Sequence, residues 1–396
     1  MSSLSISATL VSQNTVPGSL PKLQNGIEIY IDGELKNITP IQNPIAWITK
    51  EPKMPEIKII NKSLFSISAN LTIEYDMQKT YNGQSYNRLF KDTYPKSKSI
   101  PFPSNNPNAS NIENGKVNIR SSGEWIVHFS NEIRGGKATI EYTSGSGLME
   151  KKELFVFHIR GENPRKADVL NYITQKGYLS EYWFFMKIIR HESGTHKRDE
   201  FFQFNNKNNT YSASDQLNGL PNYGGPKGLG LSQLDNPLPT NQEAWNWKIN
   251  IDGAKKLLDT KKKEISNKFY YEGKNTNNQV TKFGWIHQAN EWNKNNPNNL
   301  IKQLGDQKEG KVLFGFTSTS MAGVPQEIND YFNKNKTSKA QRSYFDACLI
   351  KYYNGGGYYI KLDNSKRPPK WIIKNFWVNP KGIKKYYVTD ICLLDD

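Results

Sequence analysis

Glu192 is the carboxylate whose surroundings in the sequence most favour acid catalysis. It ends the segment EYWFFMKIIRHE (181–192), and Gly194, a residue typical of helix ends, follows it. At helical spacing Glu192 shares the apolar face of Ile188 and Ile189. Burial beside apolar groups disfavours the charged form of a carboxyl and raises its pKa. A general acid that works near neutral pH needs such a raised pKa.

Two glycine-containing motifs follow this helical Glu-Ser pair. One reads Gly-Leu-Gly-Leu-Ser-Gln over residues 228–233, and the other reads Tyr-Asn-Gly-Gly over residues 353–356. Glycine lets a backbone come close to a ligand, which is useful in a binding cleft. Glu-Ser, then Gly-x-Gly-Leu-x-Gln, then Tyr-Asn-x-Gly, in this order, resembles the goose-type lysozyme and lytic transglycosylase family over residues 167–396.

The resemblance implies a role for each matching residue. Glu192 would be the catalytic acid, and the glycine motif would line a sugar cleft and expose backbone amides to an N-acetyl sugar. The tyrosine and asparagine of the second motif would orient the acid. The substrate-binding residues implied are Ser193, Gly228, Gly230, Gln233, Tyr353 and Asn354. Two departures are Ser232, where the family usually has Met, and a long segment over 270–340.

The family's reaction is cleavage of the MurNAc-GlcNAc β-1,4 bond of peptidoglycan. A lytic transglycosylase uses one carboxyl and leaves 1,6-anhydroMurNAc ends, and this is the activity that we expect. A hydrolytic muramidase would need a second carboxylate, for which Asp215 has the most suitable spacing from Glu192. Asp199, Glu200 and Asp235 are weaker alternatives.

The expected fold class is α+β, with an N-terminal domain over residues 1–160 that resembles an immunoglobulin-like β-sandwich. Its alternating segments are separated by turn clusters, and a long loop is expected over 93–115. No catalytic group stands out there, so we interpret it as an accessory domain. The predicted strands are ISANLTIEYD (67–76), KVNIRS (116–121), EWIVHFS (124–130), KATIEYT (137–143) and ELFVFHIRG (153–161).

Residues 161–166 read as a linker, and residues 167–396 as a mainly helical, lysozyme-like domain. The segment 201–227 is expected to form loops or a small β region, and 270–340 to hold short helices. The predicted helices cover 169–173, 181–192, 250–269 and 338–353, and a β-like tail covers 384–394.

The 396 residues carry a net charge of +16. Residues 1–160 hold 18 basic and 14 acidic residues, and the rest hold 35 and 23, so the second part carries +12. This favours an anionic partner such as the bacterial wall. Aromatic residues near the motifs could stack on sugars or pack in the core. These residues are Tyr211, Tyr223, Trp245, Trp247 and Tyr358.

Other classes of function are less well supported by the residues. His191, Glu192 and His196 do not have zinc-motif spacing, and Gly194 interrupts them, so we expect no metal and no cofactor. No nucleic-acid recognition motif is present. A non-catalytic protein that binds the cell wall or nucleic acid is the remaining alternative. Cys348 and Cys392 are expected to stay reduced, although a single disulfide is left open.

The expected place of action follows from the wall substrate. The segment MSSLSISATLVSQNTVPGSL has no basic leader or long apolar block, so we expect neither a signal peptide nor a membrane span. A protein made in the cytoplasm would then reach the periplasm by a non-classical route, as an injected antibacterial effector of the type VI secretion kind or as a phage-like enzyme. Residues 1–160 would dock on a spike or tube component, and an immunity protein would protect the producer.

Overall fold

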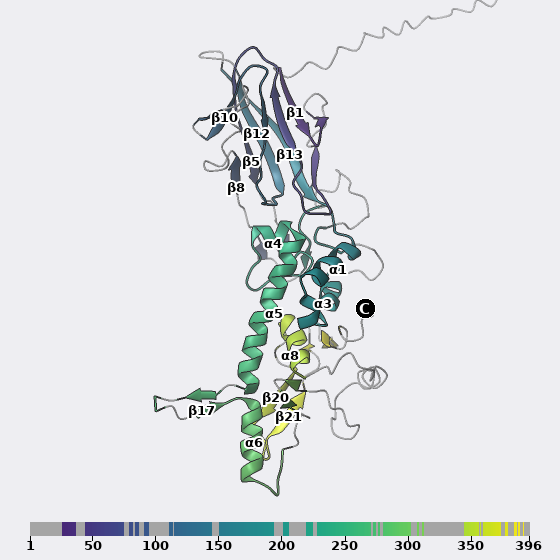
Figure 1. The fold of residues 1–396 in the computed structure, drawn as a ribbon, viewed down its shortest axis with the longest axis vertical. Helices are drawn as coiled ribbons and strands as arrows, with labels where there is room; N and C mark the ends of the chain where they lie inside the picture. Colours follow the sequence, from purple (N-terminus) through teal and green to yellow (C-terminus); the bar gives the residue numbers. More distant parts are fainter. Residues whose placement is uncertain are drawn as a thin grey trace, which may run out of the picture. The chain divides into compact units, whose positions relative to one another are not determined.

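The computed structural model contains α-helices and several β-sheets in two compact units (Figure 1). The first unit comprises Met1–Ile48, Lys53–Asp76 and Arg88–Arg160, and the second comprises Thr49–Pro52, Met77–Asn87 and Gly161–Asp396. The residues described are 26–36, 44–74, 79–81, 84–86, 91–94, 111–113, 115–144, 150–193, 201–205, 219–224, 228–270, 272–274, 276–277, 280–301, 307–308, 311–312, 344–355, 357, 359–373, 377–378, 384–385, 387–388 and 391.

The first unit contains two sheets whose paired strands are antiparallel. The four-stranded sheet has the order β11-β4-β1-β2, and the seven-stranded sheet has the order β3-β13-β12-β5-β10-β9, with β8 also paired to β5. The strands are β1 (Ile27–Ile31), β2 (Glu34–Leu35), β3 (Ile45–Ile48), β4 (Ile57–Asn61), β5 (Ile67–Glu74), β8 (Lys91–Tyr94), β9 (Asn111–Glu113), β10 (Lys116–Ile119), β11 (Glu124–Ile126), β12 (Gly136–Ser144) and β13 (Lys151–Gly161).

Alternation of side chains explains these strands. In β1 and β5 every second residue is buried, for example Ile27, Ile29 and Ile31, because successive side chains of a strand point to opposite faces. All five predicted strands are present, four with slightly different ends, while the one predicted over 124–130 is extended only over Glu124–Ile126. Residues 95–110 of the expected loop lie outside the described residues, while its flanks form β8 and β9.

The second unit holds the seven helices of the described residues and a set of two-stranded ladders. The helices are α1 (Lys166–Gln175), α2 (Tyr178–Glu181), α3 (Phe185–Glu192), α4 (Asn241–Trp245), α5 (Trp247–Tyr270), α6 (Trp285–Asn295) and α8 (Tyr344–Tyr353). The ladders pair β6 (Lys79–Tyr81) with β7 (Gln84–Tyr86), β14 (Tyr223–Gly224) with β15 (Gly228–Leu229), β16 (Glu272–Lys274) with β17 (Val280–Phe283), β18 (Gln307–Lys308) with β19 (Lys311–Val312), β20 (Ile360–Asp363) with β21 (Lys370–Ile373), and β22 (Trp377–Val378) with β23 (Lys384–Lys385).

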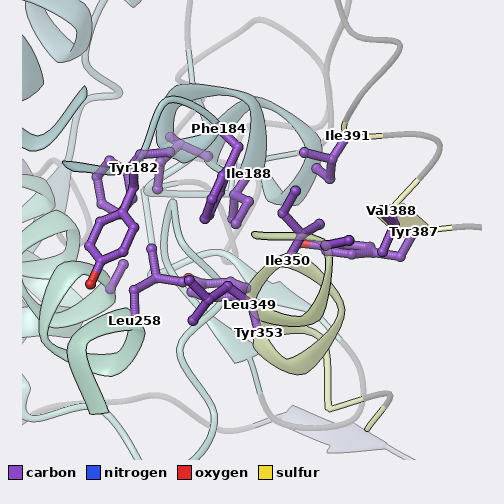
Figure 2. Close-up of a cluster of buried hydrophobic side chains, with 14 of the residues drawn as sticks. Tyr182, Phe184, Ile188, Leu258, Leu349, Ile350, Tyr353, Tyr387, Val388 and Ile391 are labelled. Carbon is purple, nitrogen blue, oxygen red and sulfur yellow. The ribbon is translucent and has the colours of Figure 1, made fainter. Parts of the chain in front are cut away.

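One apolar cluster holds together the part of this unit that contains α3. Ile251, Ala254 and Leu258 repeat at helical spacing on α5 and are fully buried. Side chains from the α2–α3 region, α5, α8 and the C-terminal segment gather there, as Figure 2 shows. The cluster therefore fixes the end of α3 against α8 and the C-terminal segment.

The helix predicted over 181–192 is interrupted. The structure has two helices, α2 and α3, because the aromatic residues between them turn to different partners. Tyr182 donates a hydrogen bond from its hydroxyl to Asp259 at 2.7 Å, and Trp183 donates from its indole nitrogen to Asp346 at 3.1 Å. One continuous helix could not direct these neighbouring side chains to α5 and α8 while keeping Phe184 buried.

The predicted β-like tail over 384–394 is also wrong as a continuous strand. Only β23 is extended, and the described residues after it, Tyr387, Val388 and Ile391, are helical. All three are buried, at a spacing of one and four residues that suits one face of a helical turn. Packing against the apolar cluster thus overrides the strand propensity of this segment.

Two smaller observations concern expectations from composition. Cys348 is a free thiol, fully buried, and its burial raises its pKa to about 12. Cys392 lies outside the described residues, so the question of a disulfide stays open.

Within the described part of the chain, every helix is too short or too polar to cross a membrane.

Candidate active site

Glu192 is the last residue of α3 and lies among groups that come from distant parts of the chain. The two isoleucines before it, Ile188 and Ile189, are fully buried in the apolar cluster. The Tyr387 hydroxyl donates a hydrogen bond to Glu192 Oε1 at 2.5 Å, and the Asn354 side chain also bonds the carboxyl. The helix end, α8 and the C-terminal segment therefore meet at one carboxyl group.

The pKa of Glu192 is raised from its ordinary value of 4.5 to about 7. Burial is the largest cause, and the nearby charge of Asp235 also raises it. The hydrogen bonds from Tyr387 and Asn354 lower the pKa without cancelling the effect of burial. Glu192 is consequently a carboxyl that can hold and release a proton near neutral pH.

Tyr387 is a site residue that the sequence pattern did not reveal. Burial is the main reason that its pKa is well above the usual value for tyrosine, so its hydroxyl stays a donor to Glu192. Its ring also contacts the His191 ring edge-to-face, with centroids 4.9 Å apart. Two successive residues of α3 thus hold the tyrosine, one through its ring and one through its hydroxyl.

The glycine motif forms a tight turn after β15. Leu229 and Leu234 exchange two backbone hydrogen bonds, at 3.0 and 3.2 Å, and Gly230 and Gln233 both have positive φ, at 75° and 50°. The amide of Gly230 donates to Asn222 O, and that of Gln233 donates to Gly230 O. The amides of 231 and 232 donate to side chains. Every backbone amide from 229 to 234 thus donates to an acceptor within the protein. The expected exposure of these amides to a sugar is thus not what the structure shows.

Two fully buried amide side chains hold this turn. Gln203 accepts from the Leu231 amide at 3.0 Å, and Asn250 accepts from the Ser232 amide at 2.8 Å while donating to Leu229 O at 3.1 Å. A Cβ at Gly230 would come within 2.6 Å of Asn250 and 2.7 Å of Gln203. Glycine is required here because these side chains approach the backbone so closely.

The other glycine of the motif makes room for Gln233. Its side-chain nitrogen donates to Gly230 O at 2.7 Å, and its oxygen lies 2.7 Å from where a Cβ of Gly228 would be. Gln233 therefore folds back over its own turn, and Gly228 and Gly224, where a Cβ would lie 1.9 Å from the Gln233 side-chain oxygen, both make room for it.

Tyr353 joins this turn to the acid. Its buried hydroxyl donates to Ser232 O at 2.8 Å, and burial followed by the charges of Glu192 and Asp235 raises its pKa well above the usual value. Asp235 and Asn354 are both exposed, so the rim of the site is open to solvent on the side of these two residues.

The remaining predicted residues divide into three groups. Ser193 caps α3 and is buried beside Glu192. Asp215, Asp199, Glu200 and His196 lie outside the described residues, as do Tyr211 and Tyr358. Trp245 and Trp247 are almost completely buried and belong to the interior rather than to a sugar-stacking surface, whereas Tyr223 is partly exposed.

Comparisons with protein-family models, curated proteins and solved structures give no match for this chain. In the part of the chain that the structure describes, no group of three or more His, Cys, Asp or Glu side chains could hold a metal ion. The site is therefore interpreted from its own geometry.

Removing the Asn250 side chain should destabilise the second unit. Asn250→Ala would leave the buried Ser232 amide without its partner and would remove one of the two hydrogen bonds that each of the Leu229 and Glu243 carbonyls accepts. We expect a loss of about 2–4 kcal/mol in the free energy of unfolding, measured by urea denaturation. The control is Ile249→Ala at the neighbouring, exposed position. Equal effects of the two substitutions would contradict the assigned role.

Neutralising Glu192 should stabilise the protein in a pH-dependent way. Because its folded-state pKa is about 7 and its unfolded value is near 4.5, the native state binds the proton more tightly, and stability is lost as pH rises between these values. Glu192→Gln should thus increase the free energy of unfolding by up to about 3 kcal/mol at pH 8 and have little effect at pH 4. Urea denaturation at both pH values measures this, and an effect independent of pH would contradict the raised pKa.

Proposed function

We propose that the second unit cleaves the MurNAc-GlcNAc β-1,4 bond of peptidoglycan with Glu192 as general acid. The observation that carries this proposal is the partly buried Glu192 carboxyl, which has a pKa of about 7 and accepts hydrogen bonds from Tyr387 and Asn354. The Glu-Ser, Gly-x-Gly-Leu-x-Gln and Tyr-Asn-x-Gly motifs meet around this one group, and their order supports a lysozyme-like domain over residues 167–396. We further propose that the first unit is an immunoglobulin-like accessory sandwich.

The favoured reaction is a lytic transglycosylation that needs one carboxyl. Protonated Glu192 gives its proton to the glycosidic oxygen, and the bond from that oxygen to MurNAc C1 breaks. The Glu192 carboxylate then takes the proton of the MurNAc C6 hydroxyl while the oxygen of that hydroxyl bonds to C1. This step forms a 1,6-anhydro end and restores the protonated acid. Donors from Tyr387 and Asn354 stabilise the carboxylate between the two steps.

Hydrolysis is a second candidate, and the position of Asp235 favours it. Asp235 is exposed at the rim, and its charge acts on both Glu192 and Tyr353. A carboxylate so placed could activate water or stabilise the positive charge that develops on the sugar. Among the described residues Asp235 therefore takes the place that spacing had given to Asp215.

Glu192→Gln should abolish wall cleavage while the fold remains. The substitution keeps the shape of the side chain and removes the transferable proton, so we expect a loss of about 10²-fold or more. The measurement is muropeptide release from purified sacculi, with Glu264→Gln on the α5 surface as the matched control. Unchanged release by Glu192→Gln, or none by the wild type, would contradict the proposal.

Asp235→Asn separates the two reactions. If Glu192 works alone, the variant keeps most of its activity and its products still end in 1,6-anhydroMurNAc, as mass spectrometry would show. Its activity should also decline at lower pH than that of the wild type, because removing the Asp235 charge lowers the pKa of the acid. Reducing ends from the wild type, together with an inactive variant, would establish hydrolysis instead.

A further inference from the structure

The loop between β4 and β5 exposes two large apolar side chains. Leu64 is 88% exposed and Phe65 is 61% exposed, the highest values for large apolar residues in the described part of the chain. We call Lys62–Ser66 the tip loop. Two adjacent apolar side chains held in water are unfavourable for a free protein, so their exposure points to a partner that covers them.

The tip loop is held in one conformation by Asn61, which is fully buried. The Asn61 side-chain nitrogen donates to Phe65 O at 2.7 Å and to Ile119 O and Arg120 O at 3.0 Å. Its oxygen accepts from the Ser63 amide at 2.9 Å and from the Ser63 hydroxyl at 2.6 Å. The exposed side chains therefore stand on a fixed base and not on a loop that could fold inward.

Several polar atoms of the tip loop are bonded within the protein. Phe65 O accepts from Asn61, and Ser63 O accepts from the Ser121 hydroxyl at 2.6 Å. The Lys62 amide donates to Gly26 O at 2.6 Å. These bonds fix the backbone of the loop at Lys62, Ser63 and Phe65, so the two apolar side chains are presented in a defined position.

Polar and cationic residues surround the apolar tip. The Lys62 side chain is 51% exposed and pairs at 4.0 Å with Glu28, whose side chain is only 15% exposed. Arg120 and Ser121 are exposed on the neighbouring turn, and Glu124, at the start of β11, lies beyond that turn. Ser68, just after the tip loop, pairs with Thr143 of β12, and Thr143 in turn pairs with the start of β13. The tip loop therefore lies at the end of the unit where β13 begins, and Gly161, the last residue of β13, lies at the opposite end.

We propose that the tip loop binds the surface of an anionic lipid bilayer, with Leu64 and Phe65 in the outer acyl region and Lys62 and Arg120 at the headgroups. This goes beyond the proposed wall cleavage and rests on the first unit alone. Apolar contact combined with cations is the pairing of signals that holds a peripheral protein on such a membrane. A binding site for a protein partner would need a wider apolar surface. Here serines and cations surround the two apolar side chains, which favours a membrane surface instead.

The test is flotation of the full chain with vesicles of phosphatidylethanolamine and phosphatidylglycerol, compared with phosphatidylcholine alone. We expect the wild type to float with the anionic vesicles and Leu64→Ser/Phe65→Ser to bind at least about tenfold more weakly. The matched control is Leu154→Ser, since Leu154 is 59% exposed on β13 of the same unit. Lys62→Ser/Arg120→Ser should weaken binding to anionic vesicles only.

Three outcomes would overturn the proposal. The first is no binding of the wild type to anionic vesicles. The second is equal binding by Leu64→Ser/Phe65→Ser, which would show that net charge alone attracts the chain. The third is self-association of the wild type, measured by sedimentation without lipid, that this double variant abolishes while vesicle binding is unchanged. Muropeptide release from sacculi in solution should be the same for all three variants and the wild type.

Discussion

The burial of one carboxyl group is the constraint on which the arrangement of the second unit depends. Removing Glu192 from water raises its pKa to about 7, and this is unfavourable for the folded protein whenever the group is charged. The apolar cluster around Ile188 and Ile189 provides the burial. Tyr387 and Asn354 limit its cost by bonding the carboxyl and also give it a defined direction. Burial of Glu192 thus lowers the free energy of unfolding at neutral pH, and it produces a carboxyl that can transfer protons in this pH range.

The rest of the unit serves to hold the partners of this carboxyl in place. Gln203 and Asn250 fix the glycine turn from inside, and Tyr353 links that turn to the end of α8. Buried amide side chains suit this purpose because each satisfies several backbone groups at once and an unsatisfied group would be costly. The glycines are then explained by the closeness of these side chains, with no ligand required.

Local patterns predicted the helical segment that ends at Glu192, although not its interruption, and five strands of the first unit, although not those between residues 27 and 61. Periodicity located the apolar face of Ile188 and Ile189, and burial of that face is what the structure has. Tyr387 could not be found in this way, because its contact with Glu192 spans 195 residues and its segment has strand-like composition. Spacing along the chain favoured Asp215, which lies outside the described residues and stays a prediction, while Asp235 follows the glycine turn and acts on Glu192 through its charge.

The protonation of Glu192 can be measured directly by following its side-chain carboxyl carbon with NMR in protein labelled with carbon-13 glutamate, using Glu192→Gln for assignment. The account predicts a pKa near 7 in the wild type. It also predicts a higher value in Tyr387→Phe, since that variant lacks a hydrogen bond that favours the charged form. A carboxyl that titrates near 4.5, unaffected by loss of the Tyr387 hydroxyl, would contradict the assignment of Glu192 as a buried general acid.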